Sequence, residues 1–135
     1  MTDNSPQPQV WPTLRARDAR GLIKFLVDAF GFEETVVVGE GDIVEHAQSA
    51  WPPGGGIMLG SARDDGGKWP VKPGTFGGYA VTNDPDALYA RAKAAGAEIV
   101  QELTNRDYGS REFLARDPEG NYWSFGTYRG EPHKS

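Results

Sequence analysis

The chain has 135 residues, enough for one domain whose hydrophobic core needs no disulfide or metal ion to hold it together. Its 14 basic and 19 acidic residues give a net charge of −5 and form no basic run, which argues against nucleic acid or an anionic membrane as partner. There is no cysteine, so disulfides and thiolate zinc sites are excluded. No apolar run approaches membrane-spanning length and the N-terminus does not resemble a signal peptide, so we expect a cytoplasmic protein.

The first half of the chain predicts one strand, one helix and three further strands. Residues 1–9 are polar and contain prolines, which is typical of a flexible arm. Asp18 is a candidate N-cap for an amphipathic helix that Gly31 ends. The strands of this half are expected over residues 10–16, 32–39, 42–50 and 56–61.

The second half repeats this order. Residues 62–74 are the longest segment without a structural pattern, and we interpret them as the linker between a module at 10–61 and a module at 75–128. Asp84 and Pro85 predict an N-cap followed by proline at the first helical position, and Gly96 ends this helix. Strands are expected over 75–82, 98–103, 112–116 and 122–128, before a tail at 129–135.

Two βαβββ modules in one chain predict an α+β fold. Each module alone could bury only one face of its sheet, so the two must pack together. In the last predicted strand, alternation places Trp123 and Phe125 on one face and Tyr122 and Ser124 on the other. The first face is apolar enough for the core, and the second suits the wall of a cavity.

The paired modules and the turn Asp117-Pro118-Glu119-Gly120-Asn121 resemble the vicinal oxygen chelate superfamily. This superfamily holds glyoxalase I, extradiol dioxygenases, fosfomycin-modifying enzymes and bleomycin resistance proteins. The resemblance covers about residues 10–128. It implies sheets that curve into half-barrels, commonly paired across a homodimer, with a ligand cavity inside.

The resemblance also indicates where a metal ion would be held. Metal-dependent members carry His, Gln or Glu at four cavity-facing positions, which correspond here to Trp11, Met58, Gly77 and Ser124. None of these residues is a usual ligand of zinc, iron or magnesium. We therefore expect no metal site, no cofactor and no catalytic residue of the family's metal-dependent kind.

Aromatic residues are frequent among the positions expected to line or border the cavity. Such a pocket suits a flat, apolar or cationic small molecule held by stacking, although the same rings could simply fill the sheets. The candidate ligand-binding residues are Trp11, His46, Trp51, Met58, Trp69, Tyr79, Ser110, Glu112, Leu114, Tyr122 and Ser124.

Two classes of function remain open. In the first, the protein binds a bulky aromatic antibiotic or metabolite without transforming it. In the second, it is a glyoxalase-like lyase, an isomerase or a dioxygenase, with Glu112 or His46 as the base if no metal takes part. Each of these two residues also has a simpler interpretation, since Glu112 could pair with a neighbouring arginine and a lone His46 could be a hydrogen-bonded wall residue.

Overall fold

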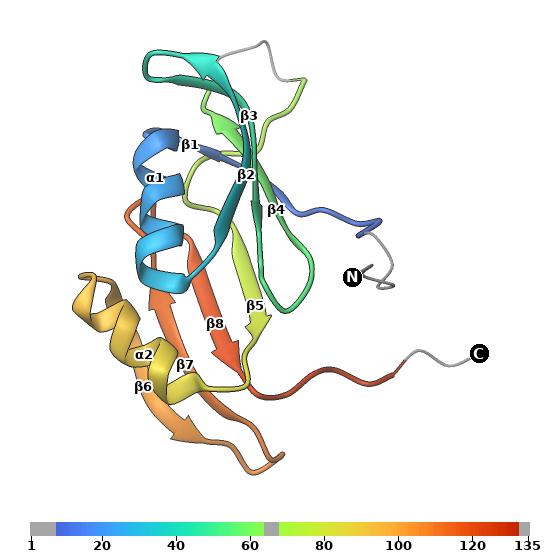
Figure 1. Ribbon diagram of the computed structural model, residues 1–135, viewed down its shortest axis with the longest axis vertical. Coiled ribbons are helices and arrows are strands. Elements are labelled where there is room, and N and C mark those ends of the chain that lie inside the picture. The colour runs from blue at the N-terminus through green and yellow to red at the C-terminus, as the bar shows by residue number, and fades with distance from the viewer. Residues whose placement is uncertain (1–7, 64–67, 133–135) are drawn as a thin grey trace, which may run out of the picture.

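The computed structural model describes residues 8–63 and 68–132, and it consists of two βαβββ modules. Each module has a four-stranded sheet, in the orders β1-β4-β3-β2 and β5-β8-β7-β6. The helices lie on one side of the molecule, and the described segments before β1 and after β8 extend to the other (Figure 1). The elements are β1 (Thr13–Ala16), α1 (Ala19–Phe25), the π-helical turn η1 (Leu26–Phe30), β2 (Glu33–Glu40), β3 (Ile43–Ala50), β4 (Gly56–Ser61), β5 (Gly77–Val81), α2 (Pro85–Ala94), β6 (Glu98–Asn105), β7 (Arg111–Arg116) and β8 (Tyr122–Gly126).

The predicted α+β fold of two βαβββ modules is confirmed, and neither sheet closes into a barrel. Within the described ranges, no helix has the length and apolar character needed to cross a bilayer. The expected arm at residues 1–9 lies mostly outside the described residues, as do residues 64–67 of the expected linker and 133–135 of the tail.

The helix ends follow from local side-chain chemistry. The carboxylate of Asp18 accepts a hydrogen bond from the Gly21 amide at 3.0 Å, and that of Asp84 accepts one from the Ala87 amide at 3.0 Å. Each satisfies an amide that has no partner inside its helix. Gly31 and Gly96 follow the helices with φ of 82° and 86°, a conformation that costs glycine little.

The first strand is shorter than the sequence suggested. Pairing of β1 with β4 is parallel and begins where the Met58 amide donates to the Pro12 carbonyl at 2.9 Å, so β1 starts at Thr13 rather than at residue 10. Proline has no amide hydrogen, which limits it to the start of a ladder. The last strand ends at Gly126 instead of residue 128.

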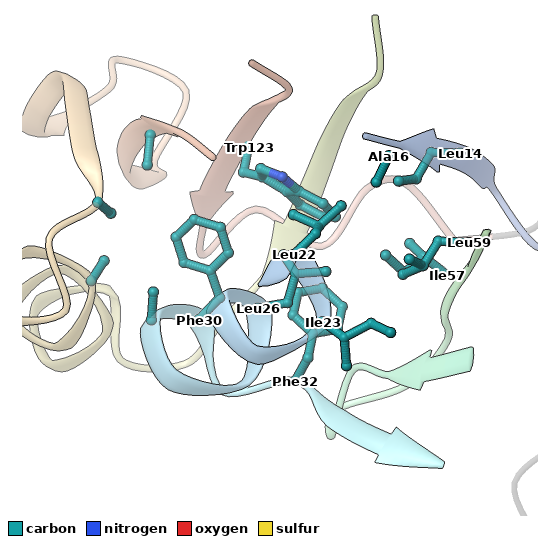
Figure 2. Close-up of a cluster of buried hydrophobic side chains, with 14 of the residues drawn as sticks. Leu14, Ala16, Leu22, Ile23, Leu26, Phe30, Phe32, Ile57, Leu59 and Trp123 are labelled. Atoms are coloured by element: carbon teal, nitrogen blue, oxygen red, sulfur yellow. The ribbon is translucent and has the colours of Figure 1, made fainter. Parts of the chain in front are cut away.

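One hydrophobic core runs through both modules. Trp123 and Phe125 of β8 are buried in it, as their alternation predicted. The Trp123 ring lies 5.4 Å from Phe32 and 5.9 Å from Phe30, which both belong to the first module. Figure 2 shows Trp123 among the leucine side chains of α1 and η1. The burial of these large side chains therefore stabilises the docking of the two modules as well as each sheet.

The turn between β7 and β8 is organised by one buried carboxylate. Asp117 Oδ1 accepts from the amides of Glu119 and Asn121 at 2.9 and 3.0 Å, and Oδ2 accepts from Asn121 Nδ2 and Trp123 Nε1 at 2.9 and 3.0 Å. Four donors thus satisfy a side chain that is only 5% exposed. A buried carboxylate needs such partners, because leaving it unpaired would cost several kcal/mol.

The same turn holds two other elements in place. The Asn121 side-chain oxygen accepts from the Phe76 amide at 3.0 Å, immediately before β5. The Glu119 carboxylate accepts from the amides of Arg17 and Asp18 at 2.7 and 2.9 Å, at the N-terminus of α1. A carboxylate is favourable there because helix amides without internal partners face it. The motif that carried the family resemblance is therefore a structural connection between the modules.

We predict that Asp117→Ala lowers the free energy of unfolding by about 3 kcal/mol or more, since it leaves several buried N–H donors without a partner. Urea denaturation would measure this loss. Asp42→Ala, in the exposed turn between β2 and β3, is the control and should change stability by less than about 0.5 kcal/mol. Equal stabilities for the two variants would contradict the structural role of the Asp117 carboxylate.

Candidate functional site

A cleft lies between the two modules, beside the edge strand of the second sheet. β1 ends the first sheet and β5 ends the second, and a cavity of about 570 Å³ lies along β5. Aromatic rings and glycines dominate its walls. The residues that line it are Pro12, Phe32, Trp51, Pro53, Gly54, Gly56, Ile57, Phe76, Gly77, Gly78, Tyr79, Ala80, Val81, Trp123 and Arg129. A concave site of this size, with mostly apolar walls and few polar groups, suits a small organic ligand.

Trp51 forms one wall of the cleft and also spans it. Its ring packs 4.9 Å from Phe32 and 5.8 Å from Phe125, so it joins the shared core. Its indole Nε1 donates to the Val81 carbonyl of β5 at 2.8 Å. The sequence placed Trp51 in a loop at the rim of a cavity, and the structure adds a role in holding the modules together.

Trp11 lies beside the cleft on the face of the first sheet that no helix covers. A Cβ at Gly56, which lines the cleft, would be 3.0 Å from the Trp11 ring, so glycine at that position makes room for the ring. Trp11 Nε1 donates to the Pro8 carbonyl at 3.3 Å. The open side of the first sheet thus brings an indole to the edge of the cavity.

On the other side of the cleft, the open face of the second sheet carries six of the predicted residues. Register places Tyr79, Ser124 and Leu114 side by side across β5, β8 and β7. Tyr122 follows in the next row and stacks against Arg116, whose guanidinium carbon is 5.5 Å from the ring centre. Such a cation–π contact holds an exposed ring in place.

Glu112 is the polar centre of this face and is 7% exposed. Its Oε1 accepts from the Tyr108 hydroxyl at 2.7 Å and from Arg106 Nε at 3.4 Å. A Cβ at Gly126 would lie 2.6 Å from Glu112 Cγ and 2.7 Å from the Tyr79 hydroxyl, so glycine there lets the two side chains meet. Glu112 therefore forms an ion pair with an arginine, as its simpler interpretation predicted, and the partner is Arg106.

The tyrosines around Glu112 keep their protons at neutral pH. The hydrogen bond to Glu112 raises the pKa of Tyr108, and burial raises the pKa of Tyr79 with a further contribution from the Glu112 charge. Tyr79 donates to the Tyr128 carbonyl at 2.7 Å, and the Tyr128 amide donates to the buried Ser110 hydroxyl at 3.1 Å. The segment that follows β8 is thereby fixed over this face.

Several of these rings remain in contact with solvent. Tyr79 and Tyr122 are 44% exposed, and Tyr108 and Tyr128 are 57% and 40% exposed. The rings of Tyr108 and Tyr128 meet edge to face at 5.9 Å. Of these four rings, Tyr79 lines the cleft, and the cluster extends from it the apolar area available to a ligand.

Three predicted residues lie on the open face of the first sheet instead. Met58 lies between Thr13 and Gln48 in the sheet register. His46 and Trp69 line a separate hollow of about 370 Å³ together with Arg15, Glu45, Arg63 and four other residues. His46 Nε2 is 3.0 Å from Gln48 Nε2, in keeping with its interpretation as a hydrogen-bonded wall residue.

The structure thus divides the predicted residues. Trp51 and Tyr79 line the cleft, Trp11 borders it, and His46 and Trp69 line the second hollow. Sequence reasoning missed Phe32, Phe76 and the Trp123 ring as part of the cleft, because their pattern indicated only a core. It also missed Tyr108 and Arg106, which reach Glu112 from the β6–β7 loop. Their only signal was their nearness to Glu112 in the sequence.

The side chains do not fit the metal centre of the family's enzymes. Trp11, Met58 and Gly77 offer no oxygen or nitrogen side-chain ligand suited to a transition metal, and Ser124 is a weak one. Among the residues that the structure describes, no group of three or more His, Cys, Asp or Glu side chains gathers in a ligating arrangement.

Residues 9–125 match the sequence profile of the Glyoxalase/Bleomycin resistance protein/Dioxygenase superfamily. The chain belongs to this superfamily. The match spans both modules and includes the Asp117 turn, in agreement with the resemblance seen in the sequence.

Relatives extend the comparison. An uncharacterized protein of Mycobacterium bovis is 34% identical over 132 residues, which cover 89% of this chain and 83% of that protein. The crystal structure of TioX from Micromonospora sp. ML1 is similar, with a TM-score of 0.73 and 28% identity, over 88% of this chain and 97% of that one. A superfamily member from Sphaerobacter thermophilus has a TM-score of 0.68 at 20% identity, over 88% and 97% of the two chains, and shows the shared fold alone.

We predict that Trp51→Phe lowers the free energy of unfolding by about 1 kcal/mol, because it removes the hydrogen bond to Val81 and keeps most of the ring packing. The substitution should accelerate amide hydrogen exchange in β5 more than in β3. Trp69→Phe, at an exposed position outside the shared core, is the matched control. A stability loss in the Trp69 variant as large as that in the Trp51 variant would contradict the bridging role of Trp51.

Proposed function

We propose that this protein binds a planar aromatic small molecule in the cleft between its modules and does so without a metal ion. The observation that carries the proposal is the cavity of about 570 Å³, which is lined by the rings of Trp51, Phe32, Phe76 and Trp123 and by residues of β5. Aromatic walls bind flat ligands by stacking, which suits sequestration of a bulky aromatic antibiotic or metabolite. The superfamily includes resistance proteins, which supports this interpretation.

Binding rather than chemistry is favoured by what the site contains. The four positions that hold a metal ion in the family's enzymes carry Trp11, Met58, Gly77 and Ser124, which are poor ligands. Glu112 is a buried carboxylate on the open face of the second sheet, and its Oε1 is already engaged by Tyr108 and Arg106. A base must be able to reach its substrate, and Glu112 is not among the residues that line the cleft.

We predict that planar bicyclic compounds such as 2-naphthol quench tryptophan fluorescence on binding, since two tryptophans line the cleft. Trp51→Ala should weaken binding by about 1–3 kcal/mol, the usual effect of losing an aromatic anchor, and Trp51→Phe should retain most of the affinity. Trp69→Ala is the control and should bind normally. If Trp69→Ala lost binding and Trp51→Ala did not, the ligand would lie in the hollow beside His46 instead.

The second candidate function is a glyoxalase-like lyase or dioxygenase reaction with a metal held by other residues. Elemental analysis of purified protein separates the two. We predict less than stoichiometric zinc, nickel or iron, because the described donor set cannot hold one of these ions well. About one such ion per chain, retained through dialysis, would contradict metal-free binding and favour the enzyme.

We also propose that the protein is a homodimer. Each sheet is covered by helices on one face only, and the edge strands and aromatic side chains of the other face are left open. A second copy of the chain could cover these edge strands and aromatic side chains, as is common in this superfamily. Sedimentation velocity should give about twice the 14.7 kDa mass of one chain, and a 14.7 kDa species at micromolar concentration would contradict the dimer.

A further inference from the structure

The backbone of β5 presents hydrogen-bonding groups to the cleft. β5 is an edge strand that pairs with β8 in parallel. At the two ends of this ladder, the Tyr122 amide donates to the Phe76 carbonyl at 3.1 Å and the Thr82 amide donates to the Gly126 carbonyl at 2.9 Å. In a parallel ladder the backbone groups of successive residues point to alternate sides. The even-numbered residues of this segment therefore face β8, and Gly77, Tyr79 and Val81 face away from it.

One contact confirms this orientation independently. The Val81 carbonyl accepts from the Trp51 indole, which approaches from the side opposite β8. The N–H and C=O groups of Gly77 and Tyr79 have the same orientation, and no other described strand pairs with β5 on that side. Strand edges of this kind readily accept hydrogen bonds from an added partner.

The shape of the cleft brings a ligand close to these groups. Gly77 lines the cleft and has no side chain, and a Cβ placed on it would have no other atom within 4 Å, so a ligand can approach the strand closely at this position. Across the cleft lie the rings of Phe32 and Trp51. A flat molecule that stacks on the rings can therefore meet the backbone of β5 with its edge.

We propose that the cleft selects planar heterocycles that carry an N–H donor and a C=O acceptor side by side on one edge, as in a cyclic amide. This inference rests on the proposed binding function and adds the chemical class of the ligand. The donor of the heterocycle bonds an outward carbonyl of Gly77 or Tyr79, and its acceptor bonds an outward amide. A ligand without the donor covers a backbone carbonyl and leaves it unpaired, which lowers affinity.

Isoquinolin-1(2H)-one and its N-methyl derivative test this inference, because they have the same ring system and differ in the donor. We expect the N–H compound to bind at least about tenfold more tightly in calorimetry. In ¹⁵N–¹H correlation spectra, the amide signals of Gly77 and Tyr79 should move on binding. Their movement with the N–H compound should exceed that with the N-methyl compound.

Gly77→Leu gives the matching protein variant, since a Cβ at this position has open space and the longer side chain would occupy the cleft beside the backbone of β5. It should abolish the preference for the N–H compound. Val36→Leu, on the exposed strand β2, is the control and should keep this preference. Equal affinity for the two compounds would overturn the inference and leave the binding proposal standing. The same conclusion would follow if the amide signals of Tyr108 and Glu112 moved on binding and those of Gly77 and Tyr79 did not. Failure of 2-naphthol and both heterocycles to bind would overturn both proposals.

Discussion

The arrangement of the two modules depends on the hydrogen bonds that the buried carboxylate of Asp117 accepts. This carboxylate collects four N–H donors in a buried turn and fixes the side chains of Asn121 and Trp123. Asn121 then positions the start of β5, while the neighbouring Glu119 binds the amides at the start of α1. One short turn thereby sets the first module's helix and the second module's edge strand in a fixed relation.

The cleft exists because the two sheets pack on one hydrophobic core, while no described strand of the first sheet pairs with a strand of the second. Trp123 from the second module packs on Phe30 and Phe32 from the first, so the modules are held by apolar contact on the helix side. On the open side, β1 and β5 remain edge strands, and Trp51 is the side chain that reaches across to β5. A site between two units of one core is suited to binding, since its walls are rigid and its polar groups few.

Local patterns in the sequence were enough to predict most of the fold. Asp18, Asp84, Gly31 and Gly96 mark the helix ends through interactions within a few residues, and strand alternation placed Trp123 in the core. The start of β1 was less predictable, because it depends on pairing with a strand more than 40 residues away, as the Thr13–Met58 register shows. Helix caps and strand alternation predict structure well where the tertiary contacts favour the same conformation.

The site was only partly predictable, for the same reason. Alternation correctly gave the face of Tyr79, Ser124 and Leu114, which is a local property. It could not indicate that His46 and Trp69 lie in a hollow apart from the cleft, or that Phe32 and Phe76 line the cleft. Those facts depend on how two modules dock, and no periodicity within either module encodes the distance between them.

A crystal structure of the protein with a bound planar ligand tests the central claim most directly. Electron density for the ligand is predicted between the Trp51 ring and the backbone of β5, with the ligand plane against the aromatic wall. Density confined to the hollow beside His46 and Trp69, or a metal ion bound on the open face of either sheet, would contradict it.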